Sequence, residues 1–192
     1  KVLYWVSPPV LEASPDRPAA RAAYGLQGYE VAVGVIGRIS KTKGQRMFLE
    51  ALLPLLEAHP CLKLFIAGAA DFEDPAEEAS VKDLASQAPE RVTVTGKMVD
   101  SREFLDAMDV LVVPSLWEEP FGLVAVEGMA RSLPVVATRS GGLQEIVEHG
   151  VTGFIVKKDA RSLREAVESL VTDAVLRARM GEAGRERVQR MF

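Results

Sequence analysis

The chain has 192 residues, of which 48% are hydrophobic and 26% charged, and its formal net charge is -4. This length suits one domain with a full hydrophobic core and is short for two. The mild negative charge gives no general attraction for nucleic acid, so an anion site must be local, and no apolar run reaches the ~20 residues that cross a bilayer.

Residues 1–29 hold four of the eleven prolines, with glycines near their end, which predicts a lead-in or interdomain linker segment. Beyond it, short β-rich runs alternate with longer amphipathic runs. The predicted strands are Val31–Ile36, Leu62–Ala67, Arg91–Val94, Val110–Val113, Pro134–Thr138 and Phe154–Val156. The predicted helices are Gln45–Ala58, Ala76–Gln87, Ser101–Met108, Leu123–Arg131, Gly142–Glu148 and one or two over Ala160–Arg190. This alternation predicts an α/β fold over residues 30–192, a Rossmann-like doubly wound parallel sheet.

Both ends of the chain look cut. There is no initiator Met, and the last residues, Arg190-Met191-Phe192, continue a helical pattern without a stop signal. We therefore expect a fragment of a longer protein. The single Cys61 excludes a disulfide framework and is predicted to be a buried, inert thiol, which fits a reducing compartment.

The fold alone gives no function, so the loops after the strands must decide. The loop after the first strand fails the dinucleotide fingerprint because Ile36 stands where a glycine is needed, and no Gly-Lys-Ser/Thr triplet makes a phosphate loop. Arg38, Lys41 and Lys43 instead place cations ahead of a helix start, where a diphosphate would be held well. A solvated turn with surface lysines is an equally supported interpretation.

Two carboxylates lie beyond the strand Val110–Val113, where open α/β sheets bind their ligands. Glu119 falls on the loop, and Glu127 falls inside the following helix in an otherwise apolar stretch. A buried carboxylate there needs donors, and the two adjacent hydroxyls of a ribose supply them. A charged loop residue and a satisfied helix-face residue are the alternative.

A second glycine-bearing loop follows the strand Pro134–Thr138. Its paired glycines, Gly141 and Gly142, let backbone amides approach an anion at a helix start, although such a pair more often marks a tight turn. Glu145 is interpreted as a helix N-terminal charge. His59 and His149 lie outside the strand-end motifs, so they are expected to be surface residues, and no metal site is predicted.

Taken together, these motifs resemble the C-terminal domain of family 4 retaining glycosyltransferases over roughly residues 31–157. The matching segments are Gly37-Arg38 with Lys43-Gly44, Pro114-Ser115 with Glu119-Pro120-Phe121-Gly122 and Glu127, Pro134-Val135-Val136-Ala137 with Gly141-Gly142 and Glu145, and Gly150-Val151-Thr152-Gly153. They occur in the family's order, and jointly they are highly specific.

Carried over residue by residue, the resemblance implies that Arg38 and Lys43 grip the donor's diphosphate and that Glu119 meets the transferred sugar. It implies that Glu127 takes the ribose hydroxyls. The backbone groups implied to contact sugar and phosphates are those of Phe121, Gly122, Leu123, Val124, Gly141 and Gly142. The loop Thr95–Met98, which includes Lys97, resembles the family's wall beside the nucleobase.

The resemblance also implies a two-domain GT-B enzyme, with this chain as the half that binds a UDP-, GDP- or ADP-sugar. The expected reaction is metal-independent, retaining hexosyl transfer to an acceptor hydroxyl on a sugar or a lipid-linked glycan, without a cofactor. The N-terminal domain supplies much of the acceptor site, so the isolated domain is expected to be inactive. The full-length protein is expected in the cytoplasm, either free or peripheral to the inner face of the membrane, and polysaccharide biosynthesis is its expected process.

Two alternatives from other classes stay open. One is a nucleotide-sugar epimerase or a phosphorylase-like enzyme on the same architecture, and the other is a non-catalytic module that binds nucleotide sugars. Paired glycosidase-type catalysis by Glu119 and Glu127 is not expected, because a carboxylate that holds the nucleotide cannot flank the anomeric carbon.

Overall fold

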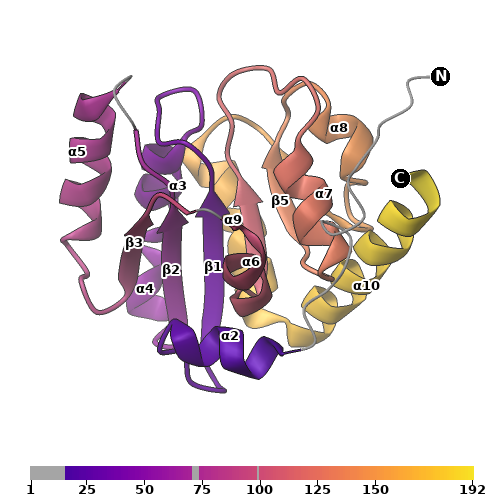
Figure 1. Ribbon diagram of the computed structural model, residues 1–192, viewed down its shortest axis with the longest axis horizontal. Helices are drawn as coiled ribbons and strands as arrows, with labels where there is room; N and C mark the ends of the chain where they lie inside the picture. The colour runs from indigo at the N-terminus through magenta and orange to yellow at the C-terminus, as the bar shows by residue number, and fades with distance from the viewer. Residues whose placement is uncertain (1–15, 71–73, 99) are drawn as a thin grey trace.

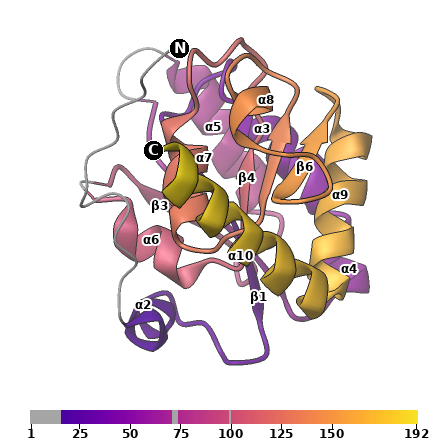
Figure 2. The same ribbon diagram turned by 90° about the vertical axis from the view of Figure 1, so that its right-hand side faces the viewer.

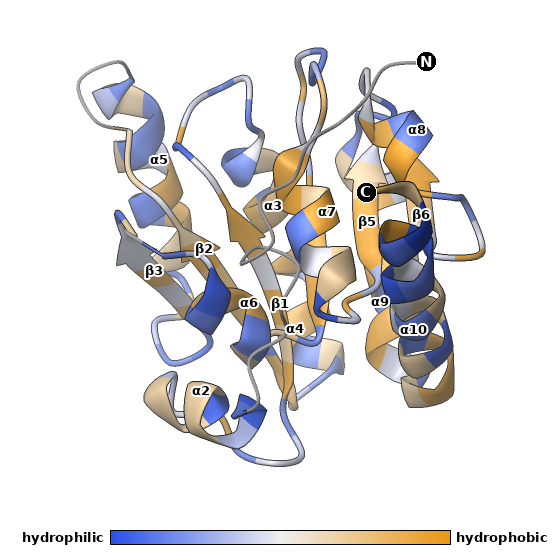
Figure 3. Ribbon diagram, turned by 45° about the vertical axis from the view of Figure 1, so that its right-hand side comes forward, coloured by the Kyte–Doolittle hydropathy of each residue, from blue (hydrophilic) through white to orange (hydrophobic). Residues whose placement is uncertain are grey.

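The computed structural model describes residues 16–70, 74–98 and 100–192 of the chain. A six-stranded parallel sheet forms its centre, with the strand order β3-β2-β1-β4-β5-β6 (Figure 1). The strands are β1 (Val31–Ile36), β2 (Leu62–Ala67), β3 (Val92–Gly96), β4 (Val110–Val113), β5 (Val135–Thr138) and β6 (Gly153–Val156). The two middle strands, β1 and β4, carry no polar side chain because helices cover both faces of the sheet (Figure 3).

Two layers of helices enclose the sheet. One face carries α3 (Gln45–Leu52), α4 (Leu55–Ala58), α5 (Pro75–Ala85) and α9 (Ala160–Thr172) over a first apolar core cluster. The other face carries α2 (Arg17–Ala23), α6 (Arg102–Ala107), α7 (Leu123–Ala130) and α8 (Leu143–Ile146) over a second cluster. Helix α10 (Ala174–Met191) runs past the sheet edge from α9 to α7 (Figure 2).

The predicted strands and the doubly wound parallel sheet are confirmed, with small shifts at the ends of β3, β5 and β6. The prediction of one helix over Gln45–Ala58 was wrong. Pro54 lacks an N–H group that could continue α3, and the separate helix α4 begins directly after it. The long C-terminal helical region divides at Asp173, whose carboxylate caps α10 by accepting a hydrogen bond from the Leu176 amide (2.8 Å). Cys61 is half-buried rather than fully buried, and it packs against the first core cluster.

Helix α2 lies inside the predicted lead-in segment. Asp16 caps it by accepting a hydrogen bond from the Ala19 amide (3.0 Å), and Pro18 falls in its first turn, where a missing N–H costs nothing. Arg17 and Arg21 then both pair with Asp109, just before β4, at 2.7 and 2.8 Å. These contacts hold α2 at the end of the sheet where the strands begin, which is the end opposite the candidate site. The domain boundary near residue 30 stays a prediction.

Within the described part of the chain, no helix is both long enough and apolar enough to pass through a lipid bilayer.

Candidate functional site

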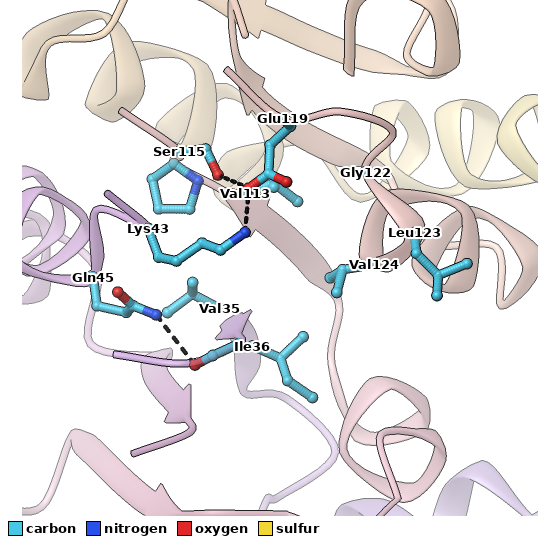
Figure 4. A pocket seen from close by; sticks show the side chains of 12 residues that line it. Val35, Ile36, Lys43, Gln45, Val113, Ser115, Glu119, Gly122, Leu123 and Val124 are labelled. Atoms are coloured by element: carbon cyan, nitrogen blue, oxygen red, sulfur yellow. Dashed lines mark hydrogen bonds and ion pairs between the residues drawn. The ribbon is translucent and has the colours of Figure 1, made fainter. Parts of the chain in front are cut away.

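The strand order reverses between β1 and β4, and the carboxyl ends of these two strands open onto a crevice. Open α/β sheets bind ligands at such a point. Two pockets of about 180 and 340 Å³ lie there, and Ile36 and Gly37 line both of them. The first, which we call the Lys43 pocket, also contains Glu119 (Figure 4). The second, the Glu127 pocket, also contains Arg38 and Lys97.

An ion pair closes one side of the Lys43 pocket. The Lys43 ammonium lies 2.5 Å from Glu119 Oε1, and the Ser115 hydroxyl donates to the same oxygen at 2.6 Å (Figure 4). The Lys43 side chain keeps 37% of its exposure, whereas that of Glu119 keeps 14%. The cation expected to hold phosphate and the carboxylate that the resemblance assigns to the sugar therefore contact each other directly.

Close backbone packing brings Lys43 to this position. Gly44 caps α3 in a left-handed conformation with φ 76°, and a Cβ placed on it would lie only 2.1 Å from the Pro114 carbonyl oxygen. The Leu116 amide donates to the Thr42 carbonyl at 2.8 Å, which joins the same two loops. Gln45 secures the start of the loop by donating to the carbonyls of Gly37 and Arg38 at 3.2 and 2.9 Å.

The loop that carries Glu119 rests on the predicted glycine pair. The Gly142 amide donates to the Glu119 carbonyl at 2.8 Å, and the Gly141 amide donates to the Glu118 carboxylate at 2.6 Å. A Cβ on Gly141 would lie 2.2 Å from the Glu119 carbonyl oxygen, so this glycine also permits the close approach. The two glycines line neither pocket among the described residues, and both amides have protein acceptors. That these two glycines contact a bound nucleotide sugar stays a prediction.

The segment from Phe121 to Val124 divides between two environments. Gly122, at φ 97°, caps α7, and together with Leu123 and Val124 it lines the Lys43 pocket. The half-buried Phe121 ring makes an edge-to-face contact with Phe192, with ring centroids 5.6 Å apart. Gly122, Leu123 and Val124 thus line this pocket, whereas the Phe121 side chain packs against the end of α10. Contact of these four residues with a nucleotide sugar stays a prediction.

Glu127 faces the second pocket from α7. Its carboxylate accepts a hydrogen bond from the Ser101 hydroxyl at 2.9 Å, and Arg38 and Lys97 line the same pocket from the loops after β1 and β3. The two basic residues and the two glutamates predicted from the sequence therefore line two pockets that share Ile36 and Gly37. Each pocket combines a cationic side chain with a carboxylate, a combination that suits a ligand with both phosphate and hydroxyl groups.

The sequence did not single out several residues that shape this site. Gln45 and Ser101 stand at or next to helix starts, and Arg131 follows Glu127 by one helical turn, so only their positions near predicted elements hinted at a role. Ser115 entered only as part of a motif. A cluster of three or more His, Cys, Asp or Glu side chains able to hold a metal ion does not occur among the described residues.

The two glutamates have pKa values shifted in opposite directions. Burial raises the pKa of Glu119, but hydrogen bonds from Lys43 and Ser115 and the charge of Lys43 together hold it below the ordinary value. Burial also raises the pKa of Glu127, and here the Ser101 hydrogen bond and the charge of Arg131 do not offset it, so this pKa lies above the ordinary value.

Opposite pKa shifts predict opposite effects on stability. Glu119 stabilises the fold above its unfolded-state pKa, and this contribution is lost as pH falls through its lowered folded-state pKa. Glu127 is protonated more readily in the folded state, so its ionisation reduces stability as pH rises from the unfolded-state pKa through the raised folded-state value. At pH 7, we therefore expect Glu119→Gln to lower the free energy of unfolding and Glu127→Gln to raise it. Urea denaturation at pH 7 and pH 4 measures this, and shifts of the same sign at pH 7 would contradict the assignment.

Comparison with known proteins gives the chain its family. The family described as "Glycosyl transferases group 1" matches residues 16–187. The chain is 33% identical over 161 residues to the capsular polysaccharide biosynthesis glycosyltransferase CapM of Staphylococcus aureus, covering 83% of this chain and 42% of CapM. It is 38% identical over 192 residues to alpha-maltose-1-phosphate synthase of Mycolicibacterium smegmatis, covering 92% of this chain and 47% of that protein. The chain thus spans about half the length of these relatives.

Solved structures show the same relation. Anabaena HepE in complex with UDP superimposes with a TM-score of 0.90 at 27% identity, over 100% of this chain and 53% of HepE. The C-terminal domain of the group 1 family protein LpcC from Francisella tularensis superimposes with a TM-score of 0.86 at 27% identity, over 97% of each chain. The chain therefore belongs to the glycosyl transferases group 1 family and has the fold of the C-terminal domain of a GT-B glycosyltransferase.

Proposed function

We propose that this chain is the donor-binding half of a glycosyltransferase and binds a nucleoside-diphosphate sugar in the crevice between β1 and β4. One observation carries the proposal: the Lys43 pocket and the Glu127 pocket share the lining residues Ile36 and Gly37, and each holds both a cationic side chain and a carboxylate. The complexes of HepE with UDP and with UDP-glucose support this choice of ligand.

In this proposal each pocket holds a different part of the donor. Glu127 accepts the ribose hydroxyls, and Lys97 stands on the side of the nucleobase. Arg38 and Lys43 hold the pyrophosphate between the pockets. Lys43 must exchange its contact with Glu119 for a phosphate oxygen, and Glu119 then becomes an acceptor for hydroxyls of the sugar. This exchange replaces one charge-assisted contact with another, so its net cost is small.

The same residues suit the chemistry of transfer. Negative charge grows on the departing nucleoside diphosphate as the glycosidic bond breaks, and fixed cations at the phosphates stabilise that state. We propose, first, that Arg38 and Lys43 supply this charge without a metal ion. We propose, second, that the acceptor attacks the anomeric carbon from the same face from which the nucleoside diphosphate departs, so that its configuration is retained. Transfer by the full-length protein that is unchanged by EDTA supports the first point, and strict dependence on a divalent ion would contradict it.

Calorimetry with this chain tests the binding step. We expect UDP, GDP or ADP to bind, with one base preferred, and the corresponding monophosphate to bind more weakly because it lacks the second phosphate. Glu127→Ala should weaken the preferred diphosphate by about 1 to 3 kcal/mol, the scale for loss of a charged hydrogen bond. Glu145→Ala is the matched control, because Glu145 is exposed on α8 and lines neither of the two described pockets. Equal affinity for mono- and diphosphates would contradict the proposal.

The acceptor site is proposed to need the N-terminal half of a GT-B enzyme. The isolated chain should therefore bind its donor and transfer sugar at no useful rate, and turnover by this chain alone would contradict a shared site. Product analysis of the full-length protein without acceptor separates the transferase from an epimerase, which needs none. A module without catalysis would give no product with any acceptor.

A further inference from the structure

A buried ion pair joins α6 to α7 behind the Glu127 pocket. Arg131, the C-cap residue directly after α7, places Nε 3.3 Å from Asp106 Oδ1 on α6. The two side chains keep only 2% and 6% of their exposure. Removing charges from water to this degree is expensive, and apolar residues of similar volume often stabilise a protein as well or better. The pair therefore calls for an explanation other than stability.

The pair is connected to Glu127 in two ways. Arg131 Nη1 donates to the Glu127 backbone carbonyl at 3.2 Å, one helical turn earlier in α7. On α6, Asp106 lies five residues after Ser101, whose hydroxyl donates to the Glu127 carboxylate. Helices α6 and α7 are thus joined at two places, by Ser101 and Glu127 at the pocket and by Asp106 and Arg131 behind it.

We propose that Asp106 and Arg131 are positioning residues, which fix α6 against α7 so that Glu127 is aimed into its pocket by Ser101. This inference rests on the proposed function, in which Glu127 accepts the ribose hydroxyls. Neither residue lines either described pocket, so both act through Glu127 rather than on the ligand. Orientation of the residue that holds a ligand by a buried partner is a general way to fix a binding site.

The ion pair also acts on the charge of Glu127. Burial raises the pKa of this carboxyl, the Ser101 hydrogen bond and the charge of Arg131 lower it, and Asp100 raises it. Arg38 and Lys97 face the same pocket. An ionised carboxylate only accepts hydrogen bonds, as contact with two hydroxyls requires, whereas a protonated one must also donate. The positive charge of Arg131 thus favours the ionised form of Glu127, which is the form that binds a ribose. Asp106 weakens this effect because its negative charge partly neutralises Arg131.

Two variants are expected to move the titration of Glu127 in opposite directions. Asp106→Asn keeps an acceptor for Arg131 but removes the neutralising charge, so the midpoint of Glu127 should fall. Asp106→Leu combined with Arg131→Met removes both charges, so neither is left buried without its partner. The midpoint of Glu127 should then rise, because the positive charge of Arg131 is lost. A ¹³C NMR titration of the Glu127 carboxyl, assigned with Glu127→Gln, measures both shifts without any nucleotide. Calorimetry at pH 7 should show UDP binding weakened about fivefold in the double variant, the scale of one impaired hydrogen bond.

Leu170→Ala is the control for stability, because Leu170 is fully buried in the core on the other face of the sheet. It should lower the melting temperature and leave the Glu127 midpoint unchanged. UDP affinity unchanged in the double variant, whether or not the Glu127 midpoint shifts, would show that the pair only holds the fold together and would overturn the inference. If the double variant does not fold, the direction of the shift in Asp106→Asn still decides. Wild-type protein that binds no UDP, GDP or ADP would contradict the proposed function, and the carboxyl titration would still test whether the pair and the Ser101 hydrogen bond act on Glu127.

Discussion

Replacing Lys43 by alanine is expected to weaken binding of the nucleoside-diphosphate donor by about 1 to 3 kcal/mol, or about 5- to 150-fold. The change removes the ammonium that we propose to contact the pyrophosphate. It also leaves the largely buried Glu119 carboxylate without the cation that lies 2.5 Å away, so the pKa of Glu119 should rise. Calorimetric titration of the wild-type and variant chains with the preferred diphosphate measures the loss.

Lys41→Ala is the matched control for this prediction. Lys41 lies in the same loop and carries the same charge, but it is exposed and lines neither described pocket. The control should bind within about twofold of wild type, since only the general field of a surface charge is lost. Lys43→Arg, which keeps the charge but changes its shape, should fall between the two. Equal losses in the Lys41 and Lys43 variants would mean that the loop acts only through its overall charge.

Replacing Gly44 by alanine should lower the free energy of unfolding by about 2 to 5 kcal/mol. The backbone at Gly44 is left-handed, which costs an L-residue about 1 to 2 kcal/mol, and the added Cβ would meet the Pro114 carbonyl oxygen at 2.1 Å. Overpacking of this kind adds about 1 to 3 kcal/mol, because the clash is with backbone and no side chain can turn away. Urea denaturation followed by circular dichroism gives the value.

The same substitution should also impair the site, because the loop that yields to the clash carries Lys43. Donor affinity should therefore fall in Gly44→Ala even where the domain remains folded. Gly28→Ala is the control: no atom lies within 4 Å of the added Cβ, and the backbone there is not left-handed. Its free energy of unfolding should stay within about 0.5 kcal/mol of wild type. Wild-type stability in Gly44→Ala would show that the two loops are not in the contact described.

Local pattern was sufficient for most of the fold. β1, β2 and β4 begin and end at the predicted residues, because a run of mostly apolar residues marks a strand that is buried on both faces. The pattern failed at Pro54, where one amphipathic run becomes two helices, and at α2, where prolines concealed a helix start. Pro18 sits in the first turn behind the capping residue Asp16, a position that proline tolerates and that a count of prolines does not detect.

The sequence singled out the charged residues that line the two pockets of the candidate site, but not the contacts between them. Arg38, Lys43, Glu119 and Glu127 each follow a strand end, and parallel strands bring such ends to one edge. The contact between Lys43 and Glu119 joins residues 76 positions apart and depends on backbone packing at Gly44, which no local pattern encodes. The ion pair between Asp106 and Arg131 could not be predicted either, because it joins residues far apart in the sequence. Taken alone, each residue looks like an ordinary charged residue of a helix.

The ion pair between Lys43 and Glu119 bears on which ligand the proposed site would prefer. Lys43 and Glu119 neutralise each other, so the largely buried Glu119 carboxylate has a cationic partner. A donor that brings both phosphate and hydroxyl groups offers each of them a new partner at once. In the proposed complex, a ligand with phosphate alone would satisfy Lys43 but leave the Glu119 carboxylate with the Ser115 hydroxyl as its remaining partner. We therefore expect a sugar diphosphate to be preferred over inorganic phosphate.

A crystal structure of this chain with a bound nucleoside diphosphate tests the central claim most directly. We expect the ribose hydroxyls within hydrogen-bonding distance of the Glu127 carboxylate and the pyrophosphate between Arg38 and Lys43, with Lys43 moved away from Glu119. A nucleotide bound outside the crevice between β1 and β4, or one whose phosphates contact neither cation, would contradict the account.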